Sequence, residues 1–137
     1  MVLIFFSHMN SGISQNKMNG LWCYIDKNST CWEEIYTDSV FWVYSDEAGI
    51  IVRKYKLANG TITQTYVDGT LYAEYKIISL TNNKVCFIFD GENGELRKIP
   101  KKYDTKEIIK GDTAAVWKYI NDYRKRKYKW ELRHKKE

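Results

Sequence analysis

Between Gly20 and Ile99, short apolar runs alternate with turn signals. The runs are rich in β-branched and aromatic residues, and a turn signal follows every eight to twelve residues, which is typical of consecutive β-strands. The pattern predicts eight strands: Leu21–Asp26, Cys31–Thr37, Val40–Tyr44, Ile50–Leu57, Thr61–Val67, Thr70–Leu80, Lys84–Asp90 and Glu95–Ile99. The turn signals in the second half of this region are Asn59-Gly60, Asp68-Gly69, Asn82-Asn83 and Gly91–Gly94.

Within these runs, apolar and polar side chains alternate. In residues 71–77 the odd positions are Leu, Ala, Tyr and Ile, and the even positions are Tyr, Glu and Lys. An open meander of this length exposes two edges of unpaired backbone groups and twists as it grows, so closure into a barrel is favoured. We therefore predict a mainly β fold: an antiparallel up-and-down β-barrel, or a strongly curved meander, of about eight strands with a C-terminal α-helix.

The pattern changes after Pro100. Asp104-Thr105 opens a short helical turn that Gly111 closes, and Asp112 or Thr113 then has the character of an N-cap. The helix that begins there carries one apolar face, which predicts that its first half packs on the barrel exterior or across one end. That face consists of Val116, Tyr119, Ile120, Tyr123 and Trp130.

The positive charge of the chain is concentrated in this C-terminal segment. Residues 112–137 hold nine Lys and Arg against four Asp and Glu, a net charge of +5 that equals the charge of the whole chain. We divide the chain into a flexible N-terminus or remnant of an export signal (1–18), an antiparallel β-barrel body (19–111) and a basic C-terminal helix and tail packed on the same domain (112–137).

Two features bear on the cellular compartment. The apolar run at residues 2–6 followed by small and polar residues is read either as the remnant of an export signal or as a frayed terminus, so an exported and a cytoplasmic protein both stay open. If the segments around Cys23 and Cys31 pair as a hairpin, the two sulfurs face each other and can form a disulfide, which suits an oxidising compartment. Cys86 lies in an apolar run and is expected to be a buried small side chain.

No catalytic apparatus is visible in the sequence. The two histidines lie near the chain ends, and there is no nucleophile elbow, phosphate-binding loop or H-E-x-x-H stretch. The acidic segment 90–95 is interpreted as a hairpin turn rather than a Ca²⁺ loop, because tight turns favour Asp, Asn and Gly. We predict a protein that is not an enzyme and has no cofactor and no metal site.

The remaining candidates are binding residues. Small barrels of about eight strands either fill themselves with side chains or hold one small ligand, and both alternatives stay open here. Five aromatic residues expected to face the interior form our candidate ligand-binding wall. They are Tyr55, Tyr66, Tyr75, Phe87 and Phe89.

The run Arg124, Lys125, Arg126 and Lys127, with Lys129 after it, is expected to project into solvent. It is read either as a solvated face or as a contact for an acidic protein, a membrane surface or, less favoured, nucleic acid. No stretch of the sequence approaches the roughly 18 apolar residues of a membrane-spanning helix.

The segment Asn19-Gly20-Leu21-Trp22 resembles the G-x-W signature of lipocalin-like proteins, and the hairpin series with a later helix is similar to their architecture. The resemblance covers residues 19 to about 135. It implies that Trp22 closes one end of the barrel, packed by a basic side chain for which we nominate Arg97. It also implies non-catalytic binding of a small hydrophobic or amphiphilic molecule. The alternative function is an interaction protein that uses its basic helix.

Overall fold

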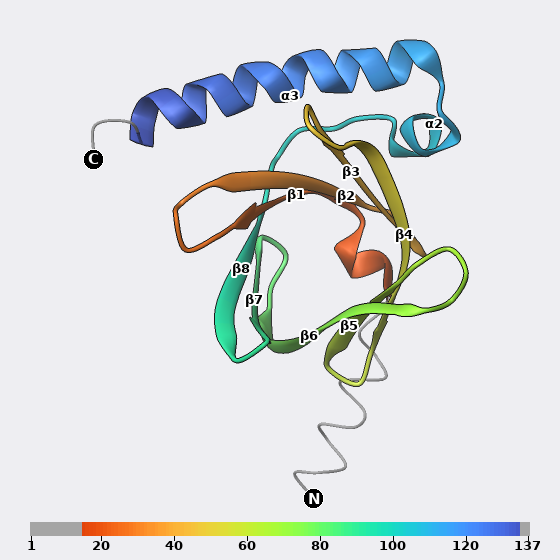
Figure 1. The fold of residues 1–137 in the computed structure, drawn as a ribbon, viewed down its shortest axis with the longest axis vertical. Helices are drawn as coiled ribbons and strands as arrows, with labels where there is room; N and C mark the ends of the chain where they lie inside the picture. Colours follow the sequence, from red (N-terminus) through yellow and green to blue (C-terminus); the bar gives the residue numbers. More distant parts are fainter. Residues whose placement is uncertain (1–14, 135–137) are drawn as a thin grey trace, which may run out of the picture.

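The computed structural model describes residues 15–134, and eight antiparallel strands in it close into one barrel (Figure 1). Each strand pairs with the next along the chain, and β1 pairs with β8 to complete the ring. The strands are β1 (Gly20–Ile25), β2 (Cys31–Tyr36), β3 (Val40–Ser45), β4 (Gly49–Ala58), β5 (Thr61–Thr65), β6 (Leu71–Leu80), β7 (Lys84–Phe89) and β8 (Glu92–Lys98). The expected up-and-down barrel with a C-terminal helix is confirmed.

The turns explain where the strands end. Asn59 and Gly60 have φ angles of 53° and 72°, so they form the tight hairpin expected between β4 and β5. Asp90 and Gly91, with φ angles of 51° and 79°, form the same kind of turn between β7 and β8. The prediction that β8 begins at Glu95 was therefore wrong, since the turn needs only two residues and the strand begins at Glu92.

One end of the barrel is closed by a short 3-10 helix, η1 (Gln15–Met18), which lies inside the ring of strands in Figure 1. Trp22 is fully buried beside it, and its indole Nε1 donates to the Met18 carbonyl at 2.7 Å. The Lys98 ammonium lies 5.0 Å from the centre of the Trp22 ring and donates to the Asn19 carbonyl at 2.7 Å. The basic partner of Trp22 is thus Lys98.

The nomination of Arg97 for that role was wrong. In the β1–β8 pairing Trp22 lies opposite Lys98, whereas Arg97 lies opposite Cys23, on the other face of the sheet. The Arg97 side chain is largely exposed and forms an ion pair with Glu95. Consecutive side chains of a strand point to opposite faces of the sheet, so a residue one position away from the partner of Trp22 cannot reach its ring.

The barrel interior holds one hydrophobic core. Inward-facing side chains from all eight strands pack together with η1. The buried members are Met18, Trp22, Tyr36, Phe41, Tyr55, Leu57, Ile62, Val85, Phe87 and Leu96. Gly94 lies directly opposite Phe87, and a Cβ atom there would come within 2.5 Å of the phenyl ring, so the absence of a side chain makes room for the ring.

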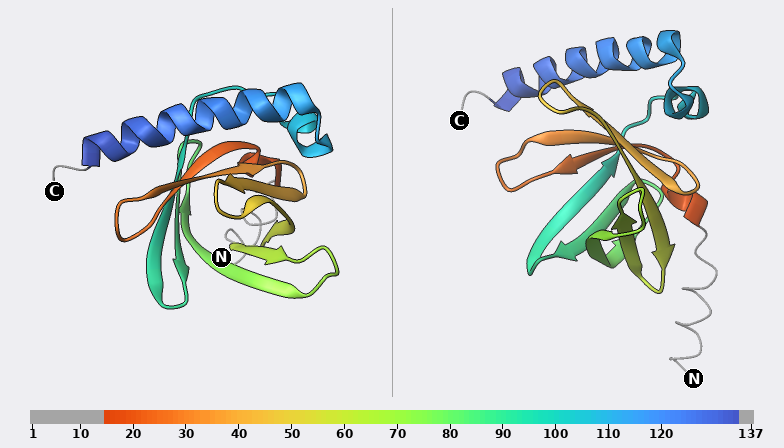
Figure 2. Two further views of the ribbon diagram at one scale, coloured as in Figure 1. Left: turned by 45° about the horizontal axis from the view of Figure 1, so that its top comes forward. Right: turned by 45° about the vertical axis from the view of Figure 1, so that its right-hand side comes forward.

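A second core lies outside the barrel. The short helix α2 (Thr105–Lys110) leads into the long helix α3 (Thr113–His134), which runs across the outer face of β1, β2 and β3 (Figures 1 and 2). The buried residues of this interface are Leu21, Ile35, Trp42, Ile108, Val116, Tyr119, Ile120 and Tyr123. Strands β1–β3 are therefore covered on both faces.

The start of α3 agrees with the prediction, because the Asp112 carboxylate accepts a hydrogen bond from the Ala115 amide at 2.9 Å. The expectation that the basic run projects into solvent was wrong for Arg126, whereas Arg124 is exposed as expected. Arg126 bends toward the barrel, where its guanidinium donates to both carboxylate oxygens of the buried Glu33 at 2.7 and 2.8 Å. Arg124 pairs with Asp46 at 3.0 Å. Neither α2 nor α3 has the length and apolar character needed to span a membrane.

Candidate ligand-binding site

The barrel is open at the end opposite Trp22, where the hairpins β1–β2, β3–β4, β5–β6 and β7–β8 surround a cavity of about 380 Å³. We call this cavity the mouth. Its volume lies near the lower end of the range of about 300 to 1,000 Å³ found for small-molecule sites. The mouth is lined by Tyr24, Trp32, Glu34, Phe41, Val43, Ser45, Ile51, Arg53, Gln64, Tyr72, Tyr75 and Phe89.

A polar cluster forms the floor of the mouth. Glu34, Arg53 and Gln64 occupy inward-facing positions of β2, β4 and β5 that apolar residues would otherwise fill. The Tyr36 hydroxyl donates to Glu34 Oε1 at 3.1 Å, and Gln64 Nε2 donates to the same hydroxyl at 3.4 Å. Two buried atoms of the cluster, Gln64 Oε1 and Arg53 Nε, have no hydrogen-bond partner. Such atoms are costly unless a ligand or water satisfies them.

The protonation of this cluster is unusual. Burial raises the pKa of Glu34 from its ordinary value of 4.5 to about 7, and the Tyr36 hydrogen bond and the Arg53 charge only partly oppose that rise. Burial and the Glu34 charge together raise the pKa of Tyr36 well above its ordinary value. Near neutral pH, Glu34 is therefore a mixture of carboxylic acid and carboxylate and can either donate or accept a hydrogen bond.

Aromatic rings form the walls above this floor. The Tyr75 ring packs against Phe87 at 5.2 Å and against Phe89 at 4.9 Å between centroids. Tyr72 also belongs to the wall, because the β5–β6 pairing is irregular at this point. Gln64 lies opposite Ala73 and Thr65 lies opposite Leu71, so Tyr72 has no partner on β5. The Arg53 guanidinium lies 3.5 Å from the centre of the Tyr72 ring, which holds the cation at the edge of the mouth.

Below the floor the barrel is filled. The enclosed space between the floor and the core is only about 10 Å³, at the lower limit of what a single water molecule needs. Phe87, Ile62 and Leu96 occupy the volume that a deep cavity would require. A ligand can therefore enter the mouth but cannot reach the centre of the barrel without displacing core side chains.

The five predicted wall residues occupy different places. Tyr75 and Phe89 line the mouth, and Phe87 lies beneath it. Tyr55 is buried in the core, with its ring 4.9 Å from that of Tyr36. Tyr66 is 46% exposed, does not line the mouth and contacts Tyr72 edge to face. It lies beyond the end of β5, where strand alternation no longer fixes its direction.

The polar floor residues Glu34, Arg53 and Gln64 were missed by sequence reasoning. The signal that identifies them is a polar residue at an inward position between two apolar inward neighbours, as for Arg53 between Ile51 and Tyr55. Among residues 15–134, no group of three or more His, Cys, Asp or Glu side chains is arranged to hold a metal ion.

A closed eight-stranded up-and-down barrel is the architecture of lipocalins and of some other small barrels, so the lipocalin-like barrel expected from Gly20-Leu21-Trp22 and the hairpin series is confirmed as a fold. No protein-family model matches the sequence. No curated protein matches it either. Among solved structures, the barrel is similar to a lipocalin-like protein from Bacteroides uniformis, with 14% sequence identity, a TM-score of 0.44, and coverage of 61% of this chain and 99% of that chain.

Proposed function

We propose that this protein binds a small amphiphilic molecule in the barrel mouth without catalysing a reaction on it. The observation that carries the proposal is the pair of unpartnered buried atoms, Gln64 Oε1 and Arg53 Nε, at the floor of an aromatic cavity. A guest whose polar end carries both a hydrogen-bond donor and an acceptor satisfies both atoms, while its apolar body lies against the aromatic walls.

The dimensions of the site define the ligand class further. Because the floor closes the barrel at Glu34 and Tyr36, the guest is compact, and a long extended chain does not fit within the interior. The mouth contains one basic side chain, Arg53, whose guanidinium already lies over the Tyr72 ring. Glu34 is partly ionised near neutral pH and offsets part of this charge, so an anionic guest finds less than one net positive charge there. A neutral molecule with an aromatic or branched body is therefore favoured.

The test is a fluorescence titration with the neutral probe N-phenyl-1-naphthylamine, at low and high salt. We expect saturable binding that salt does not weaken, because apolar contacts are not screened. Tyr75→Leu removes a wall residue and is expected to weaken binding about fivefold to tenfold. The matched control is Tyr128→Leu, which changes an exposed tyrosine of α3 that does not line the mouth.

The proposal fails if the probe does not saturate, or if Tyr128→Leu weakens binding as much as Tyr75→Leu does. Circular dichroism and thermal unfolding of both variants establish that each is folded before its affinity is compared. Native mass spectrometry of the protein purified without denaturation provides a second readout, since a co-purifying small mass that Tyr75→Leu loses identifies the natural guest.

Interaction through the basic run is less well supported as the main function. Arg124 and Arg126 are already paired with Asp46 and Glu33 of the same molecule. Lys125 and Lys127 alone remain of the four cations proposed to contact an acidic partner.

We further propose that the protein is exported. Cys23 and Cys31 form a disulfide across the β1–β2 hairpin, with Cα atoms 5.5 Å apart, and such bonds persist in oxidising compartments. Thiol alkylation in intact source cells, followed by mass spectrometry, tests this. Cys86 is partly exposed rather than buried as expected, so an exported protein is modified there alone unless it is first reduced. Modification of all three cysteines without reductant contradicts export.

A further inference from the structure

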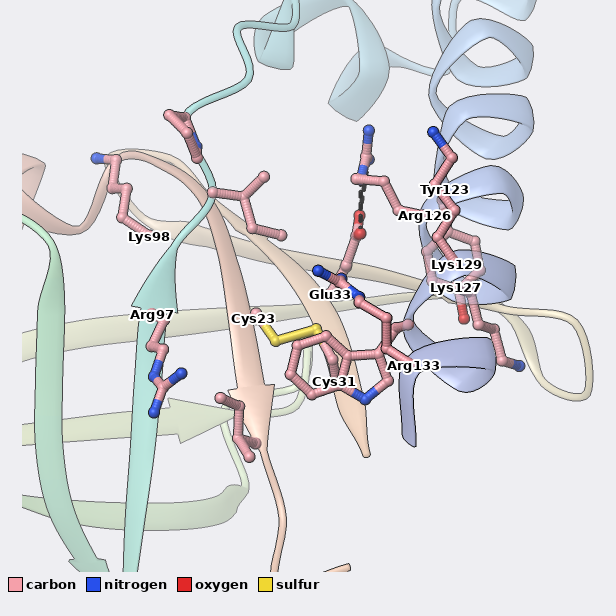
Figure 3. Close-up of a pocket in the computed structure, with 14 residues that line it drawn as sticks. Cys23, Cys31, Glu33, Arg97, Lys98, Tyr123, Arg126, Lys127, Lys129 and Arg133 are labelled. Atoms are coloured by element: carbon pink, nitrogen blue, oxygen red, sulfur yellow. Dashed lines mark hydrogen bonds and ion pairs between the residues drawn. A yellow bond between two sulfur atoms is a disulfide. The ribbon is translucent and has the colours of Figure 1, made fainter. Parts of the chain in front are cut away.

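A second cavity, of about 270 Å³, lies outside the barrel between the C-terminal half of α3 and the outer wall of β1, β2 and β8 (Figure 3). We call it the helix cleft. Helix α3 is fixed to the wall at two aromatic residues, one on each side of the cleft. Tyr123 is buried in the outer core, and the Trp130 indole donates to the Ser29 carbonyl at 2.7 Å. Lys127 lies between them at helical spacing, where an apolar residue would fill the gap.

The floor of the helix cleft is apolar. The Cys23–Cys31 disulfide lies there (Figure 3), and Ile25, Ile99, Pro100 and Trp130 supply the other apolar lining of the cleft. A plain inorganic anion would leave this floor uncovered. A ligand that carries a short apolar segment removes it from water and gains the corresponding free energy.

The lining of the cleft is strongly positive, with one carboxylate against six cations. The carboxylate is Glu33, and the cations are Arg97, Lys98, Arg126, Lys127, Lys129 and Arg133. Some of these charges are already compensated. Arg126 pairs with Glu33 and Arg97 with Glu95, while Lys98 extends away from α3 toward Trp22.

The cations left over lie on the helix. They are Lys127, Lys129 and Arg133. Lys129 and Arg133 are four residues apart on α3, so they lie on the same face of the helix along the edge of the cleft. Within residues 15–134, neither Lys129 nor Arg133 forms an ion pair. The cleft thus combines an apolar floor with an uncompensated positive rim.

We propose that the helix cleft binds a single-chain amphiphile with an anionic head group, such as an alkyl sulfate or a fatty acid. The chain lies over the disulfide and Ile99, and the head group contacts Lys129 and Arg133. This site is separate from the mouth, because the two cavities lie on opposite faces of the β1–β2 hairpin and share no lining residue.

The experiment is a titration followed by ¹H–¹⁵N NMR, with octyl sulfate as the probe at concentrations where it is monomeric. Each cavity has its own indole reporter, Trp130 in the cleft and Trp32 in the mouth. We expect a saturable shift of the Trp130 indole signal, assigned through Trp130→Phe. Octyl glucoside, with the same chain and a neutral head, and inorganic sulfate, with no chain, are both expected to bind more than tenfold more weakly.

The double variant Lys129→Gln/Arg133→Gln is expected to weaken octyl sulfate binding about fivefold. The matched control, Lys118→Gln/Lys125→Gln, removes the same charge from exposed positions of α3 that do not line the cleft, and is expected to leave the affinity unchanged. Equal weakening by the control overturns the proposal, because it shows a response to total charge rather than to the cleft.

The remaining outcomes also decide. If inorganic sulfate binds as tightly as octyl sulfate, the cleft is a simple anion site. If octyl glucoside binds as tightly as octyl sulfate, the cations do not contribute to binding. Either result overturns the proposal. Binding to vesicles containing phosphatidylglycerol without binding to the monomer assigns the cations to a membrane surface instead. A shift of Trp32 alone places the probe in the mouth and leaves the helix cleft without a ligand. Failure of the neutral probe in the mouth does not affect the Trp130 result, so the two proposals fail independently.

Discussion

Glu34 provides the sharpest test of the electrostatics described for the mouth. Its carboxyl is held among aromatic side chains at the barrel floor, and burial raises its pKa from 4.5 to about 7. A carboxyl with a raised pKa in the folded state stabilises the protein only while it is protonated. Its stabilisation is fully present below pH 4.5, and it is lost as the pH rises through 7.

The size of the effect follows from the same two values. The difference between 4.5 and about 7, multiplied by about 1.4 kcal/mol per pKa unit, gives about 3.5 kcal/mol over the full titration, of which about 3 kcal/mol falls between pH 4 and pH 8. Glu34→Gln keeps the shape and the acceptor for the Tyr36 hydroxyl but cannot ionise. We therefore expect Glu34→Gln to gain about 3 kcal/mol in unfolding free energy relative to the unsubstituted protein between pH 4 and pH 8.

The assay is urea-induced unfolding, followed by circular dichroism, at several pH values from 4 to 8 with the disulfide intact. Other titrating groups are common to both proteins and cancel in the difference. Glu74→Gln, at an exposed position of β6, is the control and is expected to show no such pH-dependent gain. A constant difference between Glu34→Gln and the unsubstituted protein across this range would refute the assignment of a buried, neutral Glu34.

Three further predictions concern stability and are checked by the same unfolding measurements. Replacing both Cys23 and Cys31 by Ser removes the cross-link between residues with a sequence separation of 8 and is expected to lower the free energy of unfolding by about 2.5 kcal/mol. An unchanged free energy of unfolding would contradict a disulfide that constrains the unfolded chain. Arg126→Met leaves the buried Glu33 without its ion-pair partner and is expected to lower the free energy of unfolding by about 3 to 5 kcal/mol. The double variant Glu33→Leu/Arg126→Met is expected to recover most of this loss. If the effects of the two substitutions simply add, the two residues are not coupled and the prediction is contradicted. Gly94→Ala forces a Cβ atom against the ring of its cross-strand neighbour and is expected to cost about 1 to 3 kcal/mol, and a neutral result would show that the ring moves freely.

Much of the fold is predictable from local chemistry. The Asn59-Gly60 dipeptide requires positive φ angles that few other residues adopt, and apolar alternation then sets which face of each strand points inward. Closure into a barrel follows because it pairs the backbone N–H and C=O groups that the two edge strands of an open eight-stranded sheet would leave without partners. The N-cap at Asp112 marks the start of α3 for the same local reason.

The candidate site was less predictable, because it depends on relations between distant strands. Tyr72 enters the wall of the mouth at an irregularity in strand pairing, and Tyr66 leaves it because β5 ends at Thr65; no local pattern reveals either. Arg97 and Lys98 differ by one position, and only the β1–β8 register decides which of them meets Trp22. The partner of Arg126 is a carboxylate 93 residues away, so the basic run alone could not show that one of its members is buried.

The position of α3 also makes the barrel mechanically uneven. Strands β1–β3 have packed side chains on both faces, whereas alternate residues of β4 and β6 face solvent. Local opening costs more free energy where more apolar contacts must separate, so amide hydrogen exchange is slowest in β1–β3 and fastest in β4–β6. A ligand larger than the mouth is therefore accommodated by displacement of β4–β6, which face away from the helix. The wall formed by β1 and β2, which lies between the two cavities, keeps its shape.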